Sequence, residues 1–377
     1  MEWKEITLGE IAIFKTGKLN SNAAISNGEY PFFTCSPETL RINNYAFDQE
    51  AILLAGNNAD GNFSIKYYKG KFNAYQRTYV ITPIRGKVDI KFLYYALSLC
   101  LKQFKNMSQG TSTKFLTVTI LNSFSVQLPS ISEQRRIASI LSSLDRKIEL
   151  NNKINADLEE MAQAIFKNWF VDFEPFKDGK FVDSELGMIP EGWKVVVFDN
   201  ILKVTTTKTG KEGIPEYSVT NTGIHPRDEK FTKNLSKSSA KNKLIRKGNL
   251  VFGMSREILN WGIMKEEVGG VSSAYNVYIV DEKIVSTTYL ECFIAQRMDY
   301  FADLIKPASR EGQGVDKALL MKKIIYIPPS EVLDVFLEKY NSIMHLTEIR
   351  NQENSCLSLL RDTLLPRLMS GELEVPE

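Results

Sequence analysis

The chain has 377 residues and a mass of 42.8 kDa, which is too long for one ordinary hydrophobic core and predicts two or three domains. Hydrophobic residues make up 43% and charged residues 24%, a balance that excludes a disordered or collagen-like chain. The formal net charge is only +2, and no stretch approaches about 18 apolar residues, so we expect neither a membrane span nor an export signal.

Residues 1–130 predict a first basic module made mainly of short strands. They hold 14 Lys and Arg against 9 Asp and Glu. Short apolar or alternating runs predict strands at residues 51–55, 79–81 and 124–126. Apolar residues that return every three or four positions predict a helix over residues 90–105. This mixture indicates an α+β fold.

Residues 131–178 predict a long acidic helix followed by a linker. The helix begins after Pro129, with Ser130 and Ser132 as candidate caps. Apolar residues then alternate at spacings of four and three, which is the pattern of a coiled-coil seam, although an ordinary amphipathic helix is the alternative. The predicted seam is Ile137, Leu141, Leu144, Ile148, Asn151, Asn155, Leu158, Ala162, Ile165 and Trp169. Pro and Gly near residues 173–179 and 187–192 indicate the linker.

Residues 179–329 predict a second basic module, with 22 Lys and Arg against 18 Asp and Glu. Strands are predicted at residues 195–197 and 277–280, and a helix over residues 288–305. The second module also begins and ends like the first. Trp3-Lys4 is echoed by Trp193-Lys194, and Gln109-Gly110 by Gln313-Gly314, in the same order along the chain. We therefore predict an internal repeat of two related modules.

Residues 330–377 predict a second long acidic helix, with 4 Lys and Arg against 9 Asp and Glu. Its predicted seam is Phe336, Ile343, Leu346, Leu357, Leu360 and Leu364. Arg350 and Glu353 interrupt this stripe, as Asn151 and Asn155 interrupt the first. Two seams that are polar in the middle can pair antiparallel with like layers matched. About 38 residues at ~1.5 Å each would give a rod of roughly 55–60 Å that holds the modules apart.

The sequence offers little catalytic chemistry. It has no GxxxxGK[ST] phosphate loop, no GxGxxG opening a helix, and no Asn/Asp-Pro-Pro-aromatic methyltransferase motif. Only two isolated histidines occur, so a Ser-His-Asp or Cys-His site is poorly supported. The four cysteines lie far apart, which argues against a disulfide scaffold or a zinc site. We expect no catalytic residue, no metal site and no cofactor on this chain.

The basic loops predict binding to double-stranded DNA. Residues 230–250 contain seven Lys and Arg and no acid, which favours phosphate contacts, although a solvated surface run is the alternative. Other loops are rich in the side chains that bond phosphates and base edges. The predicted DNA-binding residues are Lys18, Asn20, Gln76, Arg77, Gln109, Thr111, Ser112, Lys114, Lys208, Lys211, Lys230, Lys233, Lys237, Lys241, Lys243, Arg246, Arg256, Arg310, Gln313 and Lys317.

Three segments carry a family resemblance that spans the whole chain. The segment LPSISEQRRIA at residues 128–138, the linker end IPEGW at 189–193 and the terminal LLPRLMSGEL at 364–373 resemble specificity subunits of type I restriction-modification systems. The first segment has a second copy, PPSEV, at residues 328–332. This copy departs from the pattern, because Val332 stands where Gln134 stands in the first. This resemblance implies two target-recognition domains (residues 1–130 and 179–329) and two spacer helices (131–178 and 330–377).

The resemblance also implies how such a chain works. Each domain would read one half of a split DNA target, and the helices would dock methyltransferase subunits, two of them, with restriction subunits as further partners. S-adenosylmethionine, ATP and Mg²⁺ would belong to those partners, in the cytoplasm and away from any membrane. Two other functions stay open at this point: a coiled-coil adaptor that binds acidic proteins, and a self-sufficient DNA-modifying enzyme.

Overall fold

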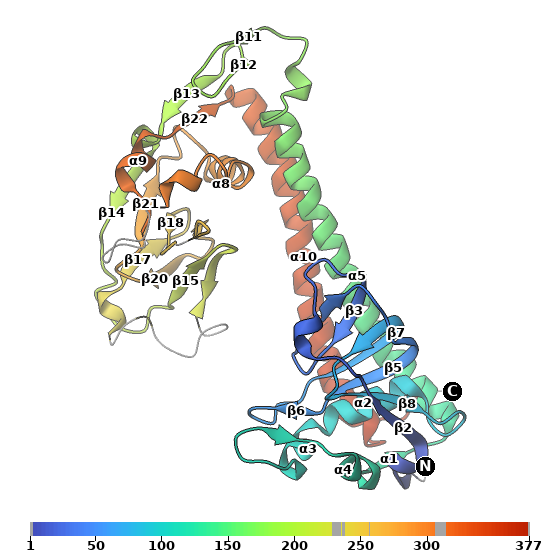
Figure 1. Ribbon diagram of the computed structural model, residues 1–377. Helices are drawn as coiled ribbons and strands as arrows, with labels where there is room; N and C mark the ends of the chain where they lie inside the picture. Colours follow the sequence, from blue (N-terminus) through green and yellow to red (C-terminus); the bar gives the residue numbers. More distant parts are fainter. Residues whose placement is uncertain (1–2, 228–234, 236–237, 256, 306–313, 376–377) are drawn as a thin grey trace. The chain divides into compact units, whose positions relative to one another are not determined.

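The chain divides into two compact units, described here from a computed structural model. The structure describes residues 3–227, 235, 238–255, 257–305 and 314–375 (Figure 1). Unit 1 comprises Met1–Ile154 and Ile349–Glu377, and unit 2 comprises Asn155–Glu348. The two 40-residue helices, α5 (Ile131–Phe170) and α10 (Ser330–Met369), each contribute one end to each unit.

A six-stranded sheet in the order β2-β8-β5-β7-β3-β4 forms the centre of unit 1. All its neighbouring strands are antiparallel except β3 and β7, which are parallel. The longest ladder runs from Phe47↔Phe72 to Leu54↔Ile65 between β5 and β7. The strands are β2 (Ala12–Thr16), β3 (Tyr30–Phe33), β4 (Leu40–Ile42), β5 (Phe47–Ala55), β7 (Ile65–Ala74) and β8 (Thr78–Pro83). This arrangement confirms the strands predicted at residues 51–55 and 79–81.

Helices and two small strand pairs complete unit 1. β1 (Lys4–Thr7) pairs with β10 (Ser125–Leu128), and β6 (Asn57–Asn58) pairs with β9 (Lys114–Phe115). Asp89 caps α2 (Ile90–Leu99) by accepting the backbone N–H groups of Lys91 and Phe92. The predicted single helix over residues 90–105 is wrong in extent, because the helix breaks at Cys100 and continues as α3. The remaining helices are η1 (Ser21–Ala23), α1 (Leu8–Ile11), α3 (Leu101–Met107) and α4 (Val118–Ser123).

Unit 2 repeats this topology. Its four-stranded sheet has the order β14-β21-β18-β19. These four strands hold the same places in the sheet, in the same order, as β2, β8, β5 and β7 hold in unit 1. The strands are β14 (Leu202–Thr205), β18 (Leu250–Phe252), β19 (Trp261–Ile263) and β21 (Asn276–Val280). β13 (Lys194–Val197) pairs with β22 (Ile324–Ile327), as β1 pairs with β10. The repeated strand order confirms two modules of similar fold.

The other elements of unit 2 are short. β15 (Tyr217–Thr220) pairs with β16 (Gly223–Pro226), and β17 (Lys243–Arg246) pairs with β20 (Val268–Val271). α8 (Thr287–Gln296) ends nine residues before the end of the helix predicted over 288–305, and η4 (Ala302–Leu304) follows it. The remaining helices are α6 (Phe198–Ile201), η3 (Ser239–Lys241) and α9 (Lys317–Lys322).

The segment predicted as a linker is folded and packed. It contains η2 (Glu174–Phe176) and a hairpin of β11 (Phe181–Val182) with β12 (Ile189–Pro190). Phe173 adopts a left-handed backbone with φ of 54° and packs edge-on against Trp193, with 5.2 Å between ring centroids. The stretch that the Pro and Gly content predicted as a linker is therefore ordered by packing of aromatic side chains.

Helices α5 and α10 pack antiparallel in each unit (Figure 1). In unit 1, Arg361 Nη1 lies 2.8 Å from Asp145 Oδ1, whereas Asn151 contacts Glu353 and Asn354. In unit 2, Phe166 and Phe170 of α5 both pack against Phe336. These pairs confirm the antiparallel coiled coil, and the sheets and helices of the two units confirm the α+β fold class. None of the helices in the described ranges is long and apolar enough to span a membrane.

Candidate nucleic-acid interface

The first group of predicted DNA-binding residues lies where the turn after β7 meets the segment after β2. Gln76 donates its backbone N–H to the Leu19 carbonyl at 2.9 Å and its Nε2 to Asn20 Oδ1 at 2.7 Å. Lys18, Asn20, Gln76 and Arg77 are all exposed. The chain can approach this closely because residue 17 is glycine: a Cβ there would lie 1.7 Å from the Ala74 carbonyl oxygen.

Arg77 connects this group to a second one. Its guanidinium lies 5.1 Å from the centroid of the Phe115 ring. Phe115 in turn exchanges two backbone hydrogen bonds with Gln109, of 2.8 and 3.0 Å. Between them, Thr111 and Ser112 lie in an exposed turn, and Gly110 has the positive φ of 101° that this turn requires. The predicted residues from Lys18 to Lys114 therefore form one connected patch in unit 1, although they span almost a hundred positions.

Sequence reasoning missed a hollow beside this patch. A cavity of about 670 Å³ is lined by Lys15, Lys18, Asn44, Tyr45 and other residues of the β2 and β5 ends. Tyr45 is 45% exposed, packs against Tyr30 and lies under the ammonium of Lys71. Lys15 and Lys18 beside the exposed ring of Tyr45 could contact phosphates, and the ring could stack on a base or a sugar. The local sequence gives no signal that joins Tyr45 to Lys15, which lies 30 positions earlier in the chain.

In unit 2 the predicted residues gather around β17. Lys208 forms a β-bridge with Lys243, and Thr209 donates its N–H to the Asn242 carbonyl at 2.9 Å. Burial lowers the pKa of Lys243, and the nearby charge of Lys317 lowers it further. Lys317 is the first residue of α9, whose start is capped by Asp316. Lys208, Lys243 and Lys317 are thus brought together, and Arg246 lies at the far end of β17.

Glu212 is a second feature that the sequence did not reveal. Its carboxylate accepts hydrogen bonds from the hydroxyls of Ser238 and Ser239, and these hold the pKa of Glu212 at about 2. The Ser239 backbone N–H also donates to it, at 3.0 Å. Glu212 therefore anchors the start of η3, which carries Lys241, next to the exposed Lys211.

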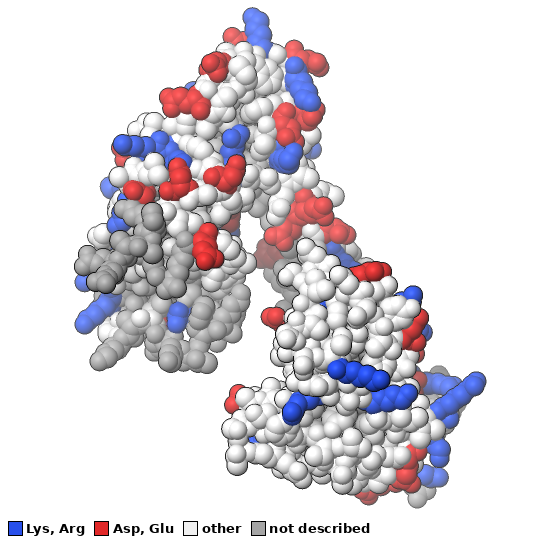
Figure 2. All heavy atoms as spheres, viewed as in Figure 1, with Lys and Arg blue, Asp and Glu red and all other residues white. Residues whose placement is uncertain are grey.

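Part of the predicted basic stretch falls on residues that the structure does not describe. Of the lysines that are described, Lys241 ends the short 3-10 helix η3 and Lys243 begins strand β17. In unit 1, Figure 2 shows Lys and Arg side chains across the middle of the visible face, with acidic side chains mainly at its margins. The predicted residues outside the described ranges are Lys230, Lys233, Lys237, Arg256, Arg310 and Gln313.

The predicted seam of α5 lies against the rest of its units. Ile137, Leu141 and Asn151 are buried, and the other predicted positions are half-buried or buried: Leu144, Ile148, Asn155, Leu158, Ala162, Ile165 and Trp169. At Asn151, Nδ2 donates to Glu353 Oε2 at 2.8 Å and to Asn354 Oδ1 at 2.9 Å. A polar layer therefore does lie within the helix pair, as the interrupted seams predicted.

The predicted stripe of α10 needs a correction. Phe336 and Ile343 are buried and Leu357 and Leu364 half-buried, but Leu346 and Leu360 are 43% and 46% exposed. Polar residues, Asn354 and Arg361, make the contacts with α5 instead. The spacing of apolar residues does not predict this register. Asn354 and Arg361 stand at seam positions where a hydrophobic seam would have leucine, and they contact α5 through hydrogen bonds and an ion pair.

Gln134 has a defined structural role in the segment that follows Pro129. It is 2% exposed, accepts the Asp89 backbone N–H at 2.9 Å through Oε1, and donates Nε2 to the Pro129 carbonyl at 2.9 Å. The side chain thereby joins the start of α2 to the start of α5.

Among the described residues, no group of three His, Cys, Asp or Glu side chains is placed to hold a metal ion.

Comparison with known proteins gives a consistent result. The profile of the type I restriction modification DNA specificity domain matches residues 1–160. The EcoDI specificity subunit of Escherichia coli is 38% identical over 227 residues, an alignment that covers 55% of this chain and half of that protein. The MjaIX specificity subunit of Methanocaldococcus jannaschii is 30% identical over 319 residues, 79% of this chain and 72% of that protein.

A solved structure shares the fold. The specificity subunit of the type I system of M. genitalium matches with a TM-score of 0.52 at 16% identity, covering 97% of this chain and 96% of that one. The fold of this chain is thus shared with a solved structure over almost the whole length of both chains. The chain belongs to the specificity subunits of type I restriction-modification systems.

Proposed function

We propose that this chain is the non-catalytic subunit that gives a type I restriction-modification complex its DNA sequence specificity. Each module would read one half of a split target in double-stranded DNA, and the helix pair would set the unread gap between the halves. The observation that carries this proposal is the duplication: two modules of one topology each bring predicted phosphate- and base-binding side chains together.

The chemistry would come from partner subunits in the cytoplasm. Two methyltransferase subunits would supply S-adenosylmethionine chemistry, and restriction subunits would supply cleavage that depends on ATP and Mg²⁺. The relatives support this division of labour, because they are named as specificity subunits of type I restriction enzymes. The sequence agrees, since it contains no phosphate loop and no amino-methyltransferase motif.

Salt-dependent DNA binding by the purified chain tests the proposal. Removing a lysine that contacts phosphate should lower the slope of log K against log salt by about 1 without changing sequence preference. We expect this for Lys18→Ala in unit 1 and Lys317→Ala in unit 2. Gln76→Ala should instead relax the preference at one position by about 1–3 kcal/mol.

The control is Lys153→Ala, because Lys153 is paired with Glu149 on α5 at 2.7 Å. This variant should bind DNA as the parent does. Binding that does not respond to salt, or that weakens equally in all the lysine variants, would contradict the proposed interface.

A further inference from the structure

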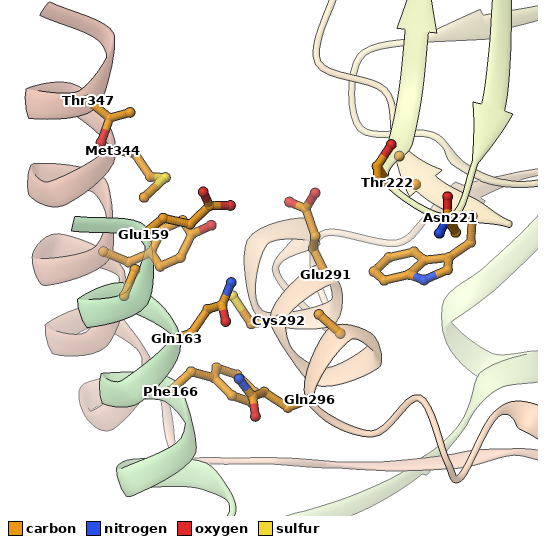
Figure 3. Close-up of a pocket in the computed structure, with 16 residues that line it drawn as sticks. Glu159, Gln163, Phe166, Asn221, Thr222, Glu291, Cys292, Gln296, Met344 and Thr347 are labelled. Carbon is orange, nitrogen blue, oxygen red and sulfur yellow. The ribbon is translucent and has the colours of Figure 1, made fainter. Parts of the chain in front are cut away.

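Two cavities, one in each unit, differ in the charge of their walls. In unit 2, a cavity of about 480 Å³ lies between α5, α10, α8 and the turn of the β15–β16 hairpin (Figure 3). Glu159 and Glu291 line it, and no described Lys or Arg does. In unit 1, Lys15 and Lys18 line the hollow of about 670 Å³, and no Asp or Glu of the described ranges lines it. Because DNA phosphates are attracted by lysine and repelled by carboxylates, the hollow of unit 1 is the one that suits DNA.

The segment between β4 and β5 forms one wall of this hollow and is held at several points. The Ala46 backbone N–H donates to the Phe72 carbonyl at 3.0 Å. The Tyr45 ring lies 5.1 Å from the Tyr30 ring, between centroids, and the Lys71 ammonium lies 4.7 Å from its centroid. Asn44 and Tyr45 are therefore exposed but have fixed positions on the wall.

A buried asparagine holds Asn44 from below. Asn73 lies in β7 and is 4% exposed. Its Nδ2 lies 2.9 Å from Asn44 Oδ1, and its own Oδ1 accepts the Ala74 backbone N–H at 2.9 Å. Burial of an amide is costly unless its polar atoms are bonded, and here one of the two bonds goes to an exposed side chain. Asn73 therefore fixes a side chain that lines the hollow.

The chemistry of these hydrogen bonds determines which way both amides face. The Ala74 N–H can only donate, so Asn73 must turn Oδ1 toward it and Nδ2 toward Asn44. The Nδ2 of Asn73 can likewise only donate, so Asn44 must turn Oδ1 toward Asn73. Within the described ranges, no residue accepts a hydrogen bond from Asn44 Nδ2. Asn44 thus offers hydrogen-bond donors to a ligand in the hollow.

We propose that Asn44 reads one base pair of the half-site bound by unit 1, by donating from Nδ2 to the carbonyl oxygen of guanine or thymine in the major groove. Cytosine and adenine carry an amino donor at that place, which Nδ2 cannot accept. Lys15 and Lys18 would contact the neighbouring phosphates. This inference rests on the proposed function and names a residue that sets its specificity. Asn44 lies in the part of the chain that matches the DNA specificity domain.

The test uses the full chain assembled with the methyltransferase subunit of its own system. The complex methylates a DNA library in which each base pair of the split target is varied, and sequencing gives the preferred base at each position. The parent should prefer guanine or thymine about tenfold at the position that Asn44 reads. Asn44→Asp keeps the shape of the side chain but replaces the donors by an acceptor. It should shift the preference at that position alone to cytosine or adenine.

Asn73→Asp tests the positioning role of the buried residue. At pH 8 one carboxylate oxygen would still accept the Ala74 N–H, and the other could only accept, so Asn44 would have to turn its amide over and present Oδ1. The preference should then change as it does in Asn44→Asp. Asn43→Asp is the matched control for added charge, because Asn43 is exposed and does not line the hollow. Its side-chain oxygen accepts the Glu29 N–H at 3.3 Å, and aspartate keeps that acceptor.

Thermal melting is measured on every variant to establish that it folds. A changed preference at one position in Asn44→Asp and Asn73→Asp, with the control like the parent, supports the inference. A parent-like preference in folded Asn44→Asp overturns it, and so does a parental preference for adenine at the affected position. A change in Asn44→Asp but not in folded Asn73→Asp overturns the positioning role of Asn73. Failure of the parent complex to select any split target would contradict the proposed function itself.

Discussion

At the scale of single residues, Gln134 shows how one side chain can join a module to a helix. Both of its amide atoms are used, one on the backbone of Asp89 and one on the carbonyl of Pro129. The residue lies at the start of α5 and is buried, so water cannot replace either partner. The requirement for an amide explains why Gln follows Glu133 in this segment.

Replacing Gln134 by Ala should destabilise unit 1. The change leaves the half-buried N–H of Asp89 and the buried carbonyl of Pro129 without their partners, which should lower the free energy of unfolding by about 1–3 kcal/mol. Urea unfolding followed by circular dichroism measures this difference. Gln127→Ala, at an exposed position of β10, is the control and should change stability little. Equal stability of both variants would show that the amide contacts contribute nothing.

Glu212 makes a pH-dependent prediction at the same scale. Hydrogen bonds from Ser238 and Ser239 favour its ionised form and hold its pKa at about 2, below the ordinary 4.5. The stabilising contribution is therefore present above pH 4.5 and is lost as the pH falls through about 2. Ser239→Ala should raise the pKa of Glu212 toward 4.5, measured by carboxyl carbon NMR. An ordinary pKa in the parent chain would show that these hydrogen bonds do not form.

At the scale of elements, the two long helices could be predicted because their evidence is periodic and local. The same period predicted Ile137, Leu141 and Asn151, which are buried on α5. It failed for Leu346 and Leu360 of α10, because Asn354 and Arg361 contact α5 through polar bonds that a hydrophobic pattern does not register. The hollow with Lys15 and Tyr45 was missed for another reason: only the sheet brings the ends of β2 and β5 together.

The helix pair predicts how the gap in the DNA target responds to helix length. We expect insertion of one heptad into both helices, after Ile154 and before Ile349, to keep the seam in register. Seven residues add about 10 Å of helix, which corresponds to about three base pairs of duplex. Sequencing of methylated DNA measures the gap. An unchanged gap would show that the helices do not act as the ruler.

At the scale of the whole molecule, the repeat of strand order is the feature with the widest consequences. The order β14-β21-β18-β19 reproduces β2-β8-β5-β7, and the flanking pairs β13–β22 and β1–β10 also correspond. The sequence alone predicted this duplication from short similar segments, such as Trp3-Lys4 and Trp193-Lys194, that recur in the same order in both halves of the chain. It could not predict which loops would meet, because the DNA-binding candidates of each module come together only through sheet pairing.

The duplication predicts that specificity can be exchanged one half at a time. A chimera that takes residues 180–329 from a related specificity subunit should recognise one new half-site and keep the other. Each module has its own sheet and its own core, so the unchanged module should fold and read as before. Methylation of plasmid libraries that carry both kinds of split target measures the outcome. A change in both half-sites would contradict independent reading by the modules.

The most direct test of the central claim is to map methylated bases in a host that makes the methyltransferase subunit with and without this chain. The account predicts methylation at one split motif, with two short half-sites and a fixed gap, only when the chain is present. The same methylation without the chain, or a single undivided motif with it, would contradict the claim that this protein supplies bipartite DNA specificity.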